Sequence, residues 1–215
     1  MEIQLTADGS STIYIPELDE HYHSVNGAVQ ESRHVFIEAG LNQCEKETIR
    51  VLELGFGTGL NALLTAIEAE KRKVKVHYIT LEKFPLEETI LKQLNYSGLD
   101  DVLFQEIHQA EWGTDVVTSD YFSMRKTETD FSDYSFPDQY DVVYYDAFAP
   151  DKQEGVWTQL LFNRIAGRMN PGAILTTYCA KGSIRRMMQS AGLTVERIPG
   201  PPGKREMLRA RRTIT

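Results

Sequence analysis

The segment YDVVYYDAFAPDKQEGVW, residues 140–157, places an acid directly after an apolar run that is typical of a buried strand. The acid is Asp146, and the aromatic residue Phe148 and the turn-forming residue Pro150 follow it. A carboxylate in such a place can stabilise positive charge that develops on a neighbouring atom, or accept a proton from it. Because ligands of open α/β sheets bind beyond the carboxyl ends of the strands, we predict that Asp146 faces a ligand crevice.

A second group of residues suited to ligand binding lies in the segment LELGFGTGLNALL. Gly55, Gly57 and Gly59 separate a strand from a helix, where glycine lets a ligand approach the backbone and the helix start offers free N–H groups. The NAD-binding pattern G-x-G-x-x-G would need glycine at Leu60. With Glu53 the pattern becomes E-x-G-x-G-x-G, which resembles the S-adenosylmethionine (SAM) loop of class I methyltransferases. We therefore expect Glu53 and the three glycines to bind SAM.

Two further acids end neighbouring predicted strands. Glu82 lies 23 residues after Gly59 and can accept hydrogen bonds from both hydroxyls of a ribose. Asp130 precedes Phe131 at the end of the third strand, where a carboxylate can meet the amino group of adenine. Since carboxyl ends of parallel strands share one edge of a sheet, we expect Glu82, Asp130 and Asp146 to line one cofactor crevice.

The elements that must position these residues alternate between strands and helices. Apolar runs predict seven strands, at residues 49–55, 75–83, 121–130, 140–148, 173–180, 193–200 and 205–212. Helical patterns predict helices at residues 58–73, 85–96, 155–169 and 183–192, and another amphipathic segment within 99–118. The alternation predicts an α/β fold with a mostly parallel, Rossmann-like sheet, and a closing antiparallel hairpin suits its class I methyltransferase variant. We expect Asn170-Pro171-Gly172 to close the helix before the fifth strand.

The length of 215 residues fits a single domain. We expect residues 49–215 to form the methyltransferase domain and residues 1–48 to form an N-terminal extension or cap. The sequence has no run near the roughly 18 apolar residues of a membrane span and no signal for secretion at its start. Cys44 and Cys179 are far apart, which favours a reduced, cytoplasmic protein. His21 and His23 lack an evident third ligand, so we predict no metal site.

The net charge of −8 is distributed unevenly along the chain. Residues 181–215 hold nine Lys or Arg and two acids, a net charge of +7, which leaves −15 for the rest. This asymmetry either marks an anionic partner on one face or neutralises the acidic body of the protein. The charge pattern leaves both interpretations open.

Five segments together resemble a known family. They are NGAVQESRHVFIEAGL, VLELGFGTGLNALLT, YYDAFAPDKQEGVWTQLLFNRIA, AKGSIRRMMQSAG and GPPGKREMLRAR. The combination of D-x-F-A-P with K-R-E-M-L resembles the methyltransferase of the MnmC family more specifically than the glycine loop alone. The resemblance implies SAM-dependent methylation of 5-aminomethyl-(2-thio)uridine at the tRNA wobble position. Bifunctional members of the family carry a flavin-dependent oxidase domain, and this chain has no room for one. We therefore expect the stand-alone form, with a separate FAD-dependent oxidase or other enzymes supplying the aminomethyl substrate.

The resemblance also implies roles for single residues. Asp146 is expected to be catalytic and to orient the aminomethyl nitrogen, and Glu31 to lie near the methionine end of SAM or the incoming amine. Phe148 and Tyr178 follow strand ends and are candidates to stack on a uracil displaced from the anticodon loop. The candidates for phosphate contacts are Lys181, Lys204 and Arg205, with Arg185 and Arg186 beside them. The stretch from Glu111 to Gln139 is longer and more polar than the family pattern.

Three other functions are weighed against this one. The chain could methylate a different RNA or a small-molecule amine with the same cofactor. An NAD-dependent oxidoreductase is disfavoured by the glycine spacing. A binding module without catalysis is disfavoured because the glycine loop, Glu82 and the D-x-F-A-P segment are all intact.

Overall fold

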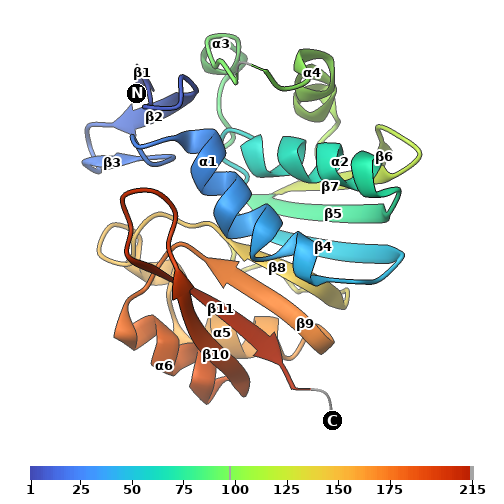
Figure 1. Cartoon of the computed structure of the whole chain (residues 1–215), viewed down its shortest axis with the longest axis vertical. Helices are drawn as coiled ribbons and strands as arrows, with labels where there is room; N and C mark the ends of the chain where they lie inside the picture. The colour runs from blue at the N-terminus through green and yellow to red at the C-terminus, as the bar shows by residue number, and fades with distance from the viewer. Residues whose placement is uncertain (97, 214–215) are drawn as a thin grey trace.

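The computed structural model describes residues 1–96 and 98–213, and its centre is an eight-stranded sheet (Figure 1). The strand order is β10-β11-β9-β8-β4-β5-β7-β6. The strands are β4 (Thr48–Leu54), β5 (Lys75–Glu82), β6 (Val116–Val117), β7 (Phe122–Glu128), β8 (Tyr140–Tyr145), β9 (Met169–Thr177), β10 (Leu193–Pro199) and β11 (Glu206–Arg212). Strands β9, β8, β4, β5 and β7 pair in parallel. Strand β11 runs antiparallel between β9 and β10, as the class I methyltransferase prediction requires.

The order of the strands reverses between β4 and β8. From β4 the chain continues to β5 and β7 on one side, whereas β8 and β9 follow on the other. The last paired residues of the two central strands are Leu54 and Tyr145, so Gly55 and Asp146 emerge side by side at the carboxyl edge. Such a switch point is where open α/β sheets bind their ligands. The topology therefore brings the glycine loop and the D-x-F-A-P segment together.

Helices cover both faces of the sheet. One face is covered by α2 (Leu60–Arg72), α4 (Asp101–Gln109) and the π-helical turn Arg33–Glu38, which continues α1 (Ala28–Ser32) (Figure 1). The other face is covered by α5 (Gln159–Ala166) and α6 (Gly182–Ser190). Successive residues of β8 belong to opposite cores: Val142 and Tyr144 to the first, Val143 and Tyr145 to the second. All six residues of β8 are buried, as expected of a central parallel strand. None of the helices in the described ranges has the length and apolar character that crossing a bilayer requires.

The first 48 residues add a separate small sheet. Strands β1 (Glu2–Leu5), β2 (Ser11–Ile15) and β3 (Glu20–His21) pair antiparallel in that order. The chain then enters α1, and a 3-10 turn at Leu41–Gln43 precedes β4. Figure 1 shows this small sheet above the carboxyl edge of the large one, so the segment after β3 lies over the switch point.

Three local predictions were wrong. All seven predicted strands are present, but the two-residue edge strand β6 makes the sheet eight-stranded. The helix predicted over residues 85–96 shrinks to α3 (Glu88–Leu91), because none of its residues is buried and tertiary packing supplies most helix stability. Asn170-Pro171-Gly172 belongs to β9 rather than to a helix end. Met169 already pairs with Tyr140, and a bulge lies before the pair of Val142 with Ile174.

Lys126 ties α4 to the sheet. Its side chain is buried on β7, with 1% of the residue exposed, and its Nζ donates to the carbonyl oxygens of Ile107 at 3.0 Å and His108 at 2.7 Å. These carbonyls belong to the last turn of α4, where a cation is favourable. The Nζ atom also lies 4.9 Å from the centre of the Trp112 ring. Burial lowers the pKa of Lys126 to about 8.

This depressed pKa predicts a pH-dependent stability difference between the wild type and Lys126→Met. Between about pH 8 and pH 10 the unfolded chain holds a proton that the folded protein releases, so the free energy of unfolding of the wild type rises with pH. Relative to Lys126→Met, we expect a gain of about 2 kcal/mol over that window. Urea unfolding followed by circular dichroism measures it. The exposed Lys75→Met serves as control, and a difference that does not vary with pH contradicts the prediction.

Candidate functional site

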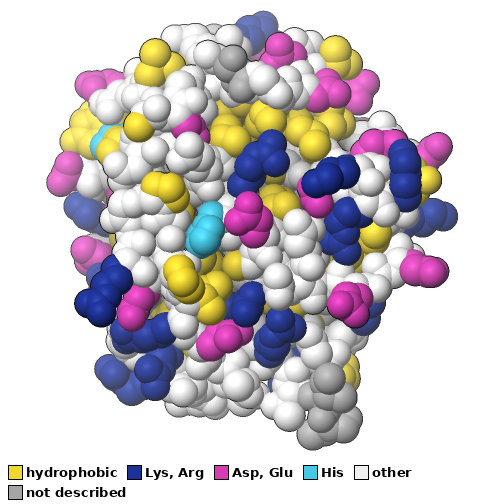
Figure 2. All heavy atoms as spheres, in the orientation of Figure 1, with side chains coloured by type: hydrophobic (Ala, Val, Ile, Leu, Met, Phe, Trp, Pro, Cys, Tyr) yellow, Lys and Arg dark blue, Asp and Glu magenta, His cyan; other side chains and the backbone are white. Residues whose placement is uncertain are grey.

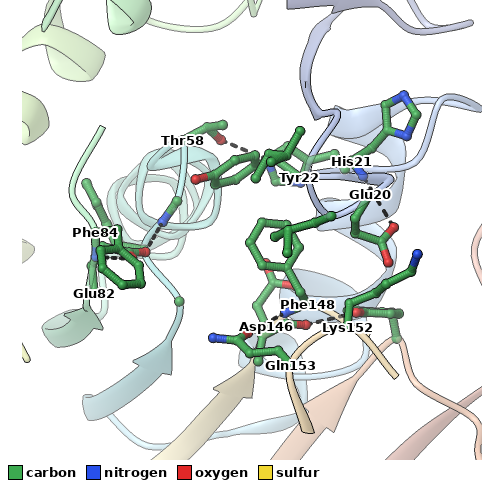
Figure 3. A pocket seen from close by; sticks show the side chains of 18 of the residues that line it. Glu20, His21, Tyr22, Thr58, Glu82, Phe84, Asp146, Phe148, Lys152 and Gln153 are labelled. Carbon is green, nitrogen blue, oxygen red and sulfur yellow. Dashed lines mark hydrogen bonds between the residues drawn. The ribbon is translucent and has the colours of Figure 1, made fainter. Parts of the chain in front are cut away.

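A cavity of 610 Å³ opens at the carboxyl edge of the sheet (Figure 3). Its volume lies within the range of small-molecule and cofactor sites. Figure 3 shows Glu82 on one side of it, Asp146 and Phe148 on another, and Tyr22 reaching over them. The residues with polar or charged side chains that line it are Glu20, His21, Tyr22, His23, Ser24, Glu31, Thr58, Glu82, Lys83, Asp130, Asp146, Lys152, Gln153, Tyr178 and Lys204.

The glycine loop between β4 and α2 can hold no larger residues at two positions. Gly55 has a φ of +97°, and a Cβ atom there would lie 2.4 Å from the carbonyl oxygen of Asp146. At Gly57, with a φ of +49°, a Cβ atom would lie 2.9 Å from the Tyr22 ring. Both glycines line the cavity, so a ligand can approach their backbone closely. Gly59 starts α2 against His108 and is not among the lining residues.

Glu82, the last residue of β5, is fixed by the loop that it faces. Its Oε2 atom accepts a hydrogen bond from the Gly57 backbone N–H at 3.0 Å, and its Oε1 atom accepts one from Phe84 N–H at 2.9 Å. Burial raises the pKa of this carboxyl above its ordinary value. The carboxylate lines the cavity beside the glycine loop, where it can accept hydrogen bonds from a nucleoside's hydroxyl groups.

Asp130 also lines the cavity, two residues beyond the end of β7. Its Oδ2 atom pairs with Lys83 Nζ at 2.8 Å, and its Oδ1 atom accepts from the backbone N–H of Ser132 at 2.9 Å. The hydrogen bond from Lys83 is the main reason why the pKa of Asp130 is lowered to about 2. Asp130 therefore presents a fully ionised carboxylate at the cavity wall.

Asp146 directly follows β8, and its backbone N–H donates to Leu54 O at 3.0 Å. Its side-chain Oδ2 atom accepts a hydrogen bond from Asn61 Nδ2 at 2.8 Å. Burial raises the pKa of Asp146 to about 7, and the negative charge of Glu31 also raises it. The hydrogen bond from Asn61 and the positive charge of Lys204 lower this pKa. The carboxyl can thus gain or lose a proton near neutral pH.

Glu53 does not reach the cavity, and its predicted direct contact with a cofactor was wrong. Its side chain points into the protein with 0% of the residue exposed. Its oxygens accept hydrogen bonds from Thr80 Oγ1 at 2.6 Å and Asn61 Nδ2 at 3.0 Å. Burial raises the pKa of Glu53 to about 8. The strand period explains the error, because Glu53 lies between Leu52 and Leu54 in a strand that is buried on both faces.

Glu31 and Lys204 meet across the cavity. Lys204 Nζ lies 2.7 Å from Glu31 Oε1 and 4.0 Å from the centre of the Tyr178 ring. Glu31 Oε2 accepts a hydrogen bond from the backbone N–H of Ser24 at 2.7 Å. The Tyr178 hydroxyl donates a hydrogen bond to Ala147 O at 2.8 Å. Lys204, predicted to contact phosphate, instead lines the cavity as half of an ion pair. Glu31 and Tyr178 lie in the cavity wall, close to Asp146.

The other predicted phosphate contacts lie outside the cavity lining. Lys181 pairs with Asp151 at 2.7 Å. Arg186 and Arg205 are exposed, Arg185 is half-buried, and in the described ranges none of the three forms an ion pair. Figure 2 shows basic side chains gathered at the lower left, where Figure 1 draws α6, and a mixture of both charges elsewhere on that face.

The N-terminal segment supplies cavity residues that sequence reasoning missed. The Tyr22 ring meets the Phe148 ring edge to face, with 5.0 Å between their centres. His23 Nε2 lies 2.7 Å from Thr58 Oγ1, and burial lowers the pKa of His23 to about 4. In the described ranges, no group of three His, Cys, Asp or Glu side chains is arranged to hold a metal ion. Of Tyr22 and His23, only His23 was considered from the sequence, as a possible metal ligand with His21, and Tyr22 carried no signal.

The comparisons with known proteins agree with this geometry. A family described as S-adenosyl-L-methionine-dependent methyltransferases matches residues 101–213. The tRNA 5-methylaminomethyl-2-thiouridine biosynthesis bifunctional protein MnmC of Cupriavidus metallidurans is 30% identical over 227 residues, covering 96% of this chain and 33% of that protein. The chain thus spans about one third of the length of this curated relative.

Two solved structures extend the comparison. The crystal structure of MNMC2 from Aquifex aeolicus superposes with a TM-score of 0.79 at 25% identity, covering 97% of this chain and 69% of that one. A methyltransferase from Pyrococcus furiosus shares the fold, with a TM-score of 0.52 at 17% identity over 96% of this chain and 90% of its own. These matches confirm the resemblance seen in the sequence and the class I fold. The open glycine loop, the Glu82 carboxylate and the cavity volume fit SAM, and the chain belongs to the family of S-adenosyl-L-methionine-dependent methyltransferases.

Proposed function

We propose that the protein methylates the aminomethyl nitrogen of 5-aminomethyl-(2-thio)uridine at the wobble position of tRNA, using SAM. The observation that carries this proposal is the position of Asp146, which lines the cavity beside the glycine loop at the switch point of the sheet. The name of the Cupriavidus relative, which includes tRNA 5-methylaminomethyl-2-thiouridine biosynthesis, supports the choice of substrate because the similarity covers 96% of this chain.

In this proposal three parts of the cavity edge each bind a different portion of SAM. The backbone at Gly55 and Gly57 accommodates the methionine part. Glu82 accepts hydrogen bonds from the ribose hydroxyls, and Asp130 accepts a hydrogen bond from the amino group of adenine. The place of Gly55 and Gly57 in the cavity lining supports the first assignment, because a glycine backbone lets a ligand approach closely. Bound SAM would supply an activated methyl group on a sulfonium, which an amine takes by in-line displacement.

Asp146 acts on the acceptor amine. The nitrogen gains positive charge as it is methylated, and a nearby carboxylate stabilises that charge in the low dielectric of a buried site. The pKa of Asp146, raised by burial to about 7, also lets the carboxylate take the proton that the methylated nitrogen must lose. Phe148 and Tyr178 line the same cavity and offer aromatic faces to the displaced uracil ring.

Incubation with SAM and tRNA that carries 5-aminomethyl-(2-thio)uridine tests the function and the role of Asp146 together. After digestion, mass spectrometry of the nucleosides should show a gain of one CH₂ on the aminomethyl uridine. Asp146→Asn should retain SAM binding in calorimetry but lose turnover at least 100-fold, a magnitude typical of a lost general base. A gain on free amines but not on tRNA contradicts the proposed substrate, and near-wild-type turnover of Asp146→Asn contradicts the proposed role.

The ribose contact predicts a selective loss of cofactor affinity. In Glu82→Gln the side chain keeps its size but loses its charge, so we expect SAM to bind about tenfold more weakly, the effect of removing one charge-assisted hydrogen bond. Isothermal titration calorimetry measures the dissociation constant. Glu128→Gln is the matched control, since Glu128 ends the neighbouring strand and is exposed. Equal SAM affinity in the two variants rules out the contact.

The arginines near the carboxyl edge predict how tRNA binding depends on salt. Arg186 follows β9 on α6, Arg205 is adjacent to Lys204, and neither is bound to an acid in the described ranges. For Arg186→Ala with Arg205→Ala, the plot of log affinity against log salt should flatten by about 0.7 for each phosphate that the variant no longer neutralises. Filter binding over a salt series measures the slopes. Arg168→Ala is the control, because Arg168 precedes β9 at the opposite edge of the sheet. If the double variant has the same salt slope as the wild type, these two arginines do not contact phosphates.

A further inference from the structure

One side-chain amide joins the fully buried carboxyl group of Glu53 to the half-buried carboxyl group of Asp146 at the cavity wall. Asn61 Nδ2 donates to Asp146 Oδ2 at 2.8 Å and to Glu53 Oε1 at 3.0 Å. The three side chains come from α2, from the segment after β8 and from β4. Asn61 lies on the first turn of α2, which begins immediately after the glycine loop, so the loop that borders the cavity also fixes the position of the amide.

The orientation of the Asn61 amide is set by these two bonds alone. Its own oxygen, Oδ1, is buried and has no hydrogen-bond partner in the part of the chain that the structure describes. The other oxygen of Glu53 accepts from Thr80 Oγ1 at 2.6 Å, which ties Glu53 to β5. The Asn61 amide thus donates one hydrogen bond to Glu53 Oε1 and the other to Asp146 Oδ2.

Charged and titratable groups face Asp146 from every neighbouring element. Glu53 lies on β4, Tyr78 on β5, Glu31 on α1, Tyr178 just after β9 and Lys204 between β10 and β11. Glu31 raises the pKa of Asp146, whereas Lys204 lowers it. Of the side chains that oppose the effect of burial on Asp146, Asn61 contributes most, and it does so through a direct hydrogen bond.

We propose that Asn61 is a positioning residue that holds the Asp146 carboxylate ionised and directed at the cavity, with Glu53 as the anchor of its amide. This inference rests on the proposed methyltransferase function, in which Asp146 must accept a hydrogen bond or a proton from the acceptor amine. A carboxyl group is purely an acceptor of hydrogen bonds only when it is ionised, and donation from Asn61 favours that form. Asn61 itself does not contact the substrate.

Asn61→Ala tests this role through the pH dependence of turnover. Without the donated hydrogen bond the pKa of Asp146 rises further, so the acid limb of the kcat profile should move up by about one pH unit. Turnover should fall about fivefold at pH 7 and recover by about pH 9, with SAM affinity within about threefold of the wild type. Asn61→Ser, which keeps one donor, should shift the limb less. Asn163→Ala, on the exposed face of α5, is the control and should leave the profile unchanged.

A carbon-13 NMR titration of the Asp146 carboxyl, in the wild type and in Asn61→Ala, reads the same shift without any turnover. If the wild type does not methylate tRNA, the proposed function fails, and the titration still decides the role of Asn61. A fall in turnover that is equal at every pH, or a carboxyl that titrates identically in both proteins, overturns the inference. A matching upward shift of the titration and of the acid limb supports it.

Discussion

Carboxylates that leave water must find hydrogen-bond donors, and this constraint shapes the centre of the molecule. Two acids lie on adjacent parallel strands: Glu53 is fully buried within β4, and the half-buried Asp146 follows β8. The amide of Asn61 and the hydroxyl of Thr80 supply the donors. Because Asn61 can reach both acids only if α2 starts where it does, the tight glycine turn, the helix and the reactive carboxylate depend on one another. The glycine loop and the Asp146 carboxylate thus form a single structural unit.

The sheet alone makes half of the site. Its carboxyl edge provides the glycine loop, Glu82 and Asp146, whereas the first strands and α1 provide the wall opposite them, with Tyr22 and Glu31. Contacts from that wall are specific: Tyr22 leaves no space for a side chain at Gly57, and His23 bonds to Thr58. The N-terminal segment is therefore a component of the cavity.

Sequence patterns located most strands, the glycine loop and Asp146, because periodicity and turn chemistry are local properties. They did not reveal contacts between residues that are distant in sequence. Glu53 has the right spacing for a cofactor contact, yet burial on both faces of β4 directs it inward. Lys204 has the charge for phosphate, yet Glu31, 173 residues earlier, pairs with it. Helix propensity over residues 85–96 was overridden because no residue of α3 is buried. Tyr22 carried no local signal at all.

The ion pair between Glu31 and Lys204 joins two residues that the ribosome synthesises at well-separated times. Its two halves are nearly a full chain apart, and both line the cavity. A nascent polypeptide can form the glycine loop and the central strands early, since chains fold progressively from the N-terminal end as they emerge. The wall of the pocket stays incomplete until residue 204 has left the exit tunnel. The cavity wall is therefore complete only after Lys204, the last of its lining residues, has been synthesised.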